Sequence, residues 1–122
     1  MSRGPEQHLS LRVRALAEHY RRRFGIWSVK LAGGPYQQPG LPDWLFSVNG
    51  RLAAIELKTP DTELSALQRF TAERIVASGA LYFTVRKLDD LRVILDWMLA
   101  LPPAQAAVPR DLLACYFSGL EP

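Results

Sequence analysis

The stretch that decides the fold is DWLFSVNGRLAAIELK, residues 43–58. Two apolar, β-prone runs flank Asn49 and Gly50, a pair that tolerates the positive φ angles of a two-residue hairpin turn. Counting outward from this turn places Asp43 directly opposite Glu56. The sequence therefore predicts an antiparallel hairpin that brings two carboxylates together at its open end.

This carboxylate pair indicates a chemical function. Directly opposed residues have Cβ atoms about 4.5–5.5 Å apart, so two like charges there destabilise the sheet unless a cation neutralises them. Side chains alternate along a strand, so Lys58 projects from the same face as Glu56. Carboxylate oxygens suit Mg²⁺, which can activate a water and polarise a phosphate while a lysine offsets developing charge. The pattern favours phosphodiester hydrolysis, and the alternative is an ordinary solvent-facing ion pair.

The rest of the chain predicts helices and strands around this hairpin. Apolar residues at three- and four-residue steps indicate a first helix that Gly25 ends, and Ser65 can cap a later one. The strand after that later helix should join the hairpin in parallel, which gives a mixed sheet in an α/β sandwich. The expected elements are helices at 6–24, 65–78 and 88–101, strands at 26–32, 43–48, 51–57 and 80–85, and a short helix from Pro109 to about 118.

Composition limits the class of protein. A chain of 122 residues fits one domain, and its net charge of +3 and pI near 9.4 suit a polyanionic partner. Cys115 is the sole cysteine, which excludes an intrachain disulfide. The charged N-terminus and the lack of a long apolar run predict a cytoplasmic protein with neither signal peptide nor membrane segment.

The motif GLPDWLFSVNGRLAAIELKTPDTELSALQ, with its Asp43, Ile55-Glu56-Leu57-Lys58 and Gln68, resembles the core of a VRR-NUC nuclease. That family is a branch of the PD-(D/E)XK superfamily, and the resemblance covers about residues 6–93. It implies a restriction-endonuclease-like α/β/α sandwich with a central mixed sheet. A C-terminal helical extension would occupy about 96–122. It also implies that Asp43, Glu56 and the backbone carbonyl of Leu57 bind the metal and that Lys58 is the catalytic lysine.

The resemblance adds two further residues to the site. The family brings a glutamate from its first helix, and Glu6 lies on the apolar stripe of that helix whereas Glu18 points away. Glu6 is therefore assigned to the metal or its water shell, and the alternative is a glutamate that complements the helix dipole. Gln68 is placed at the active site, and the alternative is a structural hydrogen bond to backbone.

Basic residues supply candidates for nucleic-acid binding, although a charge run is usually only a solvated face. Lys30 matches a basic position of the family, and Arg86 also falls where the family tends to have it. Arg21 and Arg22, on an exposed side of the first helix, complete the assignment. The three tryptophans (Trp27, Trp44 and Trp97) lie in apolar patterns and are expected in the core rather than in a base-stacking platform.

The expected partner is DNA, in a branched or otherwise structured form. Stand-alone members of the family look like Holliday-junction resolvases in DNA replication, repair or recombination, which implies a homodimer with Mg²⁺, or Mn²⁺ in its place, as cofactor. A second hypothesis is a nicking or flap nuclease that depends on a helicase or repair partner. A third is a non-catalytic nucleic-acid-binding domain.

Overall fold

A computed structural model describes residues 4–31, 38–104 and 106–117 of the chain. Gly25 ends the first helix as expected, because it takes the left-handed conformation (φ 72°) and its N–H donates to the carbonyl of Arg21. The elements are α1 (Pro5–Phe24), β1 (Trp27–Lys30), β2 (Trp44–Val48), β3 (Arg51–Leu57), α2 (Ala66–Ala77), β4 (Leu81–Val85), α3 (Leu88–Ala100) and the 3₁₀ helix η1 (Arg110–Leu112).

The four strands form one mixed sheet in the order β1-β2-β3-β4, with β1 at a free edge. The hairpin register is the predicted one: Val48 pairs with Arg51, and Trp44 pairs with Ile55. Asn49 (φ 53°) and its neighbouring glycine (φ 81°) supply the two positive φ angles of the turn. The β3–β4 pair is parallel, which confirms the mixed sheet.

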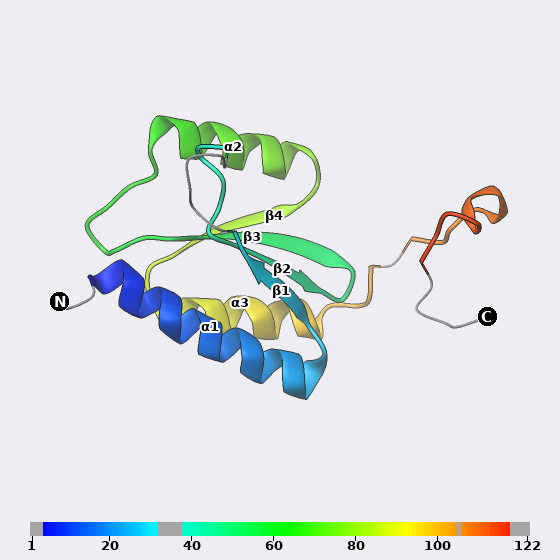
Figure 1. Cartoon of the computed structure of the whole chain (residues 1–122), viewed down its shortest axis with the longest axis horizontal. Coiled ribbons are helices and arrows are strands. Elements are labelled where there is room, and N and C mark those ends of the chain that lie inside the picture. Colours follow the sequence, from blue (N-terminus) through cyan, green and yellow to red (C-terminus); the bar gives the residue numbers. More distant parts are fainter. Residues whose placement is uncertain (1–3, 32–37, 105, 118–122) are drawn as a thin grey trace.

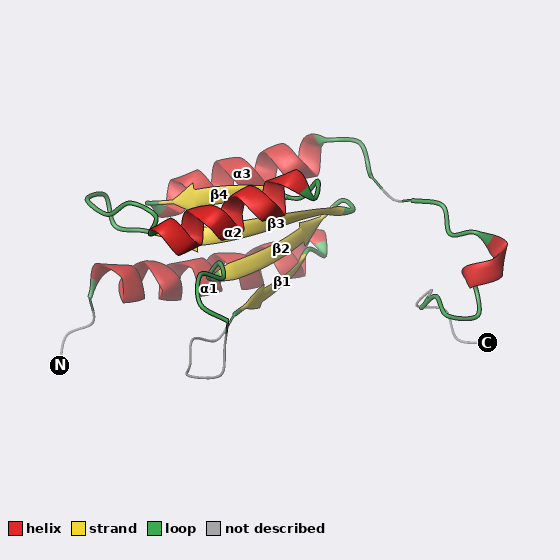
Figure 2. Ribbon diagram, turned by 90° about the horizontal axis from the view of Figure 1, so that it is seen from above, coloured by secondary structure: helices red, strands yellow, loops and turns green. Residues whose placement is uncertain are grey.

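Helices cover both faces of the sheet, so the α/β/α sandwich is confirmed. In Figure 1, α1 and α3 lie together beneath the sheet and α2 lies above it. Figure 2 shows α2 running over β3 and β4 rather than over β1. The main core lies between the sheet and the α1–α3 layer, and its largest fully buried side chains are Val13, Phe46, Val48, Ile55, Leu57, Val85, Leu91, Leu95 and Met98.

The hairpin turn also holds the end of α3. The side-chain amide of Asn49 donates to the carbonyls of Leu99 (3.1 Å) and Leu101 (3.0 Å). The Asn49 carbonyl accepts from the Ala104 N–H at 2.8 Å, and Arg51 donates to the Pro102 carbonyl at 2.6 Å. The carbonyl groups at the end of α3 are therefore capped by a side chain from the turn between β2 and β3, which is distant in the sequence.

The C-terminal part differs from the expectation. The division placed near residue 96 falls inside α3, whose Leu95 and Met98 are buried, so the core continues to the end of that helix. The helix expected from Pro109 to 118 is reduced to η1, and residue 118 lies outside the described residues. Residues 106–117 project away from the body in Figure 1, where a short helix finds no surface on which to bury an apolar face.

None of the helices in the described residues combines the length and the apolar character needed to cross a bilayer.

Candidate active site

The site is built on the open end of the hairpin, where Asp43 and Glu56 meet. Asp43 stands one residue before β2 and Glu56 is the penultimate residue of β3, so both follow directly from the Trp44–Ile55 pair. Asp43 Oδ2 accepts a 2.7 Å hydrogen bond from the Leu57 N–H, which fixes the Asp43 side chain against β3. The two carboxyl groups are close enough to share a proton in a hydrogen bond. The predicted juxtaposition is therefore present.

Glu56 is an ionisable side chain held in the interior. It is 2% exposed, and its Oε2 has no hydrogen-bond partner among the described residues. Burial, followed by the negative charge of Asp43, raises the pKa of Glu56 from 4.5 to about 8, whereas the charge of Lys58 opposes this rise. A site with this balance favours an added positive charge, either a proton or a metal cation.

Lys58 follows the last residue of β3 and is half-buried. Its backbone N–H donates to the Val85 carbonyl at 3.0 Å, which continues the β3–β4 ladder by one residue. Its ammonium group is near enough to Glu56 to stabilise the ionised carboxylate. Asp43, Glu56 and Lys58 therefore converge at one end of the sheet, as the hairpin count predicts.

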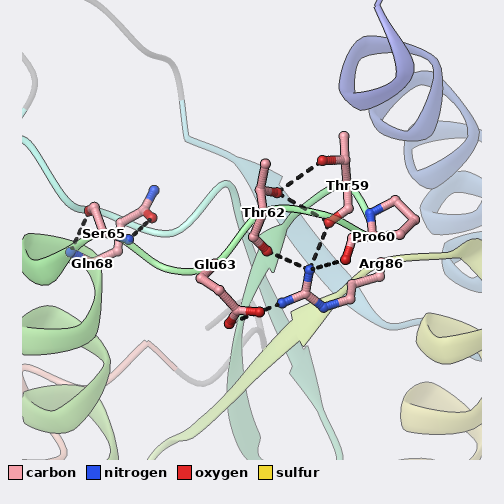
Figure 3. A network of polar contacts seen from close by, with 7 residues as sticks. All are labelled: Thr59, Pro60, Thr62, Glu63, Ser65, Gln68 and Arg86. Atoms are coloured by element: carbon pink, nitrogen blue, oxygen red, sulfur yellow. Dashed lines mark hydrogen bonds and ion pairs between the residues drawn. The ribbon is translucent and has the colours of Figure 1, made fainter.

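Gln68 makes the structural hydrogen bond to backbone that was the alternative for it, and its side chain also reaches Glu56, while a role in catalysis stays a prediction. Its side-chain Oε1 accepts from the Ser65 N–H at 3.0 Å, and its own backbone N–H donates to Ser65 Oγ at 3.1 Å, which is a reciprocal cap at the start of α2. Both capping residues are labelled in Figure 3. The remaining side-chain amide nitrogen donates to Glu56 Oε1 at 3.3 Å. The α2 cap and the carboxylate are thus joined through one side chain.

Glu6 lies in the exposed first turn of α1 and its charge also raises the pKa of Glu56. Over residues 4–31, 38–104 and 106–117, however, no group of three or more His, Cys, Asp or Glu side chains is positioned to hold a metal. Direct coordination by Glu6 therefore stays a prediction, as does its role in a water shell. Glu18 bonds Arg21 and Arg22, as expected for a solvated ion pair.

The hydroxyl of Tyr82 is a feature of the site that the sequence analysis missed. Tyr82 pairs with Ala54 in the parallel ladder and so projects from the same sheet face as Glu56. Burial, with the charges of Glu56 and Asp43, raises its pKa to about 12, and its oxygen finds no partner within the described ranges. The parallel register of β4 was the signal that could have revealed it.

Arg86 is engaged within the chain itself. Its guanidinium donates to the carbonyls of Thr59 (2.7 Å) and Thr62 (2.5 Å) and pairs with Glu63 at 3.6 Å, as Figure 3 shows. These contacts hold the loop that follows Lys58 against the end of β4. Contact of Arg86 with nucleic acid stays a prediction. The observed role of the guanidinium is structural, because it binds the loop of residues 59–63.

The other predicted basic residues lie along α1 and β1. Lys30 and Arg21 line one groove between α1 and the edge strand β1, and Arg22 is exposed on α1. Trp44 is buried, as expected, but the core assignment is wrong for Trp27 (56% exposed) and Trp97 (46% exposed). An apolar strand pattern implied burial for Trp27, whereas a strand at the sheet edge leaves one side of its residues open.

The donor atoms at the hairpin end fit a hard divalent cation. Two adjacent carboxyl groups, one of them with an unpartnered buried oxygen among the residues described, provide the oxygen ligands that Mg²⁺ and Mn²⁺ prefer. Two protein carboxylates are also a common number for Mg²⁺, which retains several waters. Coordination by the Leu57 carbonyl stays a prediction.

Comparisons with known proteins agree with this architecture. No family model matches the chain, and neither does any curated protein. A solved structure described as a VRR_NUC domain aligns with a TM-score of 0.56 and 24% sequence identity, covering 70% of this chain and 91% of the other. The chain therefore has the restriction-endonuclease-like fold of a VRR_NUC domain.

Proposed function

We propose that this chain is a metal-dependent nuclease that hydrolyses DNA phosphodiester bonds at Asp43, Glu56 and Lys58. The observation that carries the proposal is the buried Asp43–Glu56 carboxyl pair, with an oxygen of Glu56 lacking a partner among the described residues and a lysine beside it. Without a bound cation such an arrangement has a high electrostatic cost, which is typical of functional sites. The VRR_NUC-like fold adds support.

Each residue has a chemical task in this proposal. Asp43 and Glu56 would hold Mg²⁺ or Mn²⁺ together with the Leu57 carbonyl, and Glu6 would act on the water shell. A bound cation supplies Lewis acidity toward the phosphate and lowers the pKa of water. Lys58 would orient the nucleophile and offset negative charge that develops on the phosphate. Gln68 would fix the orientation of Glu56 through its 3.3 Å hydrogen bond.

We further infer that the substrate is branched or otherwise structured DNA, cut in the manner of a Holliday-junction resolvase during replication, repair or recombination. The resemblance of the motif to stand-alone VRR-NUC nucleases supports this, and so does the net charge of +3. A homodimer would place two sites on two strands of a symmetric junction. A helicase or repair partner is the alternative means of selecting the substrate.

The test is cleavage of labelled four-way junction, flap, single-stranded and duplex DNA with Mg²⁺, Mn²⁺ or EDTA. We expect cleavage with either metal and none with EDTA. Lys58→Ala should reduce the rate by about 10²–10³-fold, the usual effect of removing one group that stabilises a transition state. The exposed Lys87, at the start of α3, provides the matched control, and Lys87→Ala should cleave at the wild-type rate.

The pattern of cuts separates the hypotheses. Paired cuts across the junction indicate a resolvase and a dimer, which sedimentation can verify. Cuts that require an added helicase indicate a partner-dependent nuclease. If DNA is bound but no substrate is cut with either metal, the catalytic proposal fails for the isolated chain and a binding role replaces it.

A further inference from the structure

A groove of about 900 Å³ runs between α1 and the edge strand β1. Its walls combine basic side chains with a large exposed aromatic ring, which the proposed cleavage chemistry does not use. The lining residues on α1 are Arg14, Ala17, Glu18 and Arg21, and those on the strands are Trp27, Ser28, Val29, Lys30 and Trp44.

The strand that lines the groove ends beside the carboxyl pair, although Lys30, like its partner Trp44, faces α1 and Asp43 faces the opposite side of the sheet. Lys30 pairs with Trp44, the residue after Asp43, and the N–H of Leu31 donates to the Asp43 carbonyl at 2.8 Å. Trp27 lies three residues further along β1, about 10 Å away at the rise of a β-strand. A strand of nucleotides that follows β1 would therefore pass from the carboxyl pair to Trp27.

Trp27 projects from the same face of the sheet as Asp43. It pairs with Ser47, and side chains alternate along β2, so Ser47, Leu45 and Asp43 share that face. Trp27 is 56% exposed, whereas Trp44 is buried and its ring lies under the Arg14 guanidinium at 5.8 Å. Trp27 therefore offers an aromatic face to a ligand.

The charges in the groove favour a polyanion. Arg14, Arg21 and Lys30 carry three positive charges, and Glu18 carries one negative charge, which leaves a net +2. Glu18 is neutralised locally by hydrogen bonds from Arg21 at 2.7 and 2.8 Å. An added protein strand is the other ligand that a free edge attracts, but a lysine on an edge strand opposes such pairing. A phosphate backbone suits this groove better.

We propose that an unpaired DNA strand lies over the edge of β1, with its phosphates at Lys30 and Arg14 on the α1 side and one base stacked on Trp27 on the other side of that edge. In a duplex both faces of a base are stacked on neighbouring bases, so only an unpaired base can lie on Trp27. The direction of this strand toward Asp43 rests on the proposed nuclease function. The binding itself does not, because it needs no cleavage.

The experiment measures affinity in EDTA, where the proposed cleavage cannot occur. Fluorescence anisotropy with a labelled single-stranded oligonucleotide and with a duplex of equal length compares wild type with Trp27→Ala, Trp27→Phe and Trp97→Ala. Trp97 is the matched control because it is similarly exposed but lies on α3. Urea denaturation verifies that each variant is folded.

We expect Trp27→Ala to weaken single-strand binding by about 10-fold or more, as the loss of one stacked base implies. Duplex affinity should change by less than about threefold, Trp27→Phe should recover most of the lost affinity, and Trp97→Ala should have no effect. Equal losses for both DNA forms, no loss, or the same loss in Trp97→Ala would overturn the proposal. So would a change in dimerisation without a change in DNA affinity.

These outcomes are independent of the nuclease test. Selective single-strand binding through Trp27 with no cleavage in Mg²⁺ or Mn²⁺ would support this groove and reject the catalytic role. Cleavage by wild type together with unaltered binding by Trp27→Ala would support the catalytic role and reject the proposed binding of a DNA strand at Trp27.

Discussion

Replacing Glu56 by glutamine should stabilise the metal-free protein, and increasingly so as the pH rises. Burial and Asp43 raise the pKa of Glu56 from 4.5 to about 8 in the folded chain. The folded state therefore binds a proton more tightly than the unfolded state. The resulting stability is complete below pH 4.5 and is lost as the pH rises toward about 8.

The size of the effect follows from the same values. A tenfold change in proton affinity corresponds to about 1.4 kcal/mol, so ionising Glu56 costs up to about 5 kcal/mol of folding free energy. Glutamine keeps the shape and cannot ionise, and its amide can still reach Gln68 and Asp43. The variant should lie within about 1 kcal/mol of wild type at pH 5 and exceed it by several kcal/mol at pH 9.

Urea denaturation in EDTA at pH 5, 7 and 9 measures this difference directly. Groups remote from the site titrate equally in both proteins, so the subtraction isolates Glu56 and its immediate neighbours. The exposed Glu73 on α2 gives the control, because Glu73→Gln should follow wild type at each pH. Mg²⁺ at pH 9 should stabilise wild type but not Glu56→Gln. Parallel stability curves for wild type and Glu56→Gln would refute the reasoning.

Three further changes test the packing around the site. Asn49→Gly keeps the turn but removes the amide that caps α3, so urea denaturation should show a free energy of unfolding lower by about 1–2 kcal/mol. Asn49→Ala should lose about 1–2 kcal/mol more, because alanine is strained at the positive φ of this position. Equal stability of the two variants would contradict this. Gly40 has a φ of 85°, and a Cβ added there would lie 2.7 Å from Leu67 Cγ, so Gly40→Ala should lower the free energy of unfolding by about 1–3 kcal/mol. Adding Leu67→Ala should restore part of this loss. No recovery would show that contact with Leu67 is not the cause. Arg86→Ala should speed proteolysis of residues 59–63. Arg86→Lys should restore protection only in part, because one ammonium can replace the Nη1 bonds to Thr59 and Thr62 but not also the Nη2 contact with Glu63; full protection by lysine would refute this.

The parts of the site that the sequence predicted are those fixed by local chemistry. The Asn49-Gly50 turn allows one hairpin register, and that register alone brings Asp43 opposite Glu56 and places Lys58 beside them. The cap that Ser65 forms with Gln68 is equally local, since it spans three residues. Turn and cap residues have strong, position-specific preferences, so their consequences could be counted out along the chain.

The parts that escaped prediction depend on contacts between distant segments. Arg86 reaches carbonyls 24 and 27 residues earlier, a use that no sequence pattern around it indicates. Tyr82 meets the carboxyl pair only because β4 joins β3 in parallel. Trp27 has an apolar setting in sequence but lies on an edge strand, where burial depends on what the neighbouring layer covers.

The hairpin turn has a practical consequence for engineering this protein. Surface turns are ordinarily the safest places for an inserted tag or reporter. A single residue added at Asn49-Gly50 that shifts the pairing would turn every side chain of β3 to the opposite face. Glu56 would then enter the apolar layer between the sheet and the helices α1 and α3. The turn lies about 16 Å along the strand from the carboxyl pair, yet it sets their alignment. Labels for this chain are better attached beyond Ala104, where the backbone has left the hairpin.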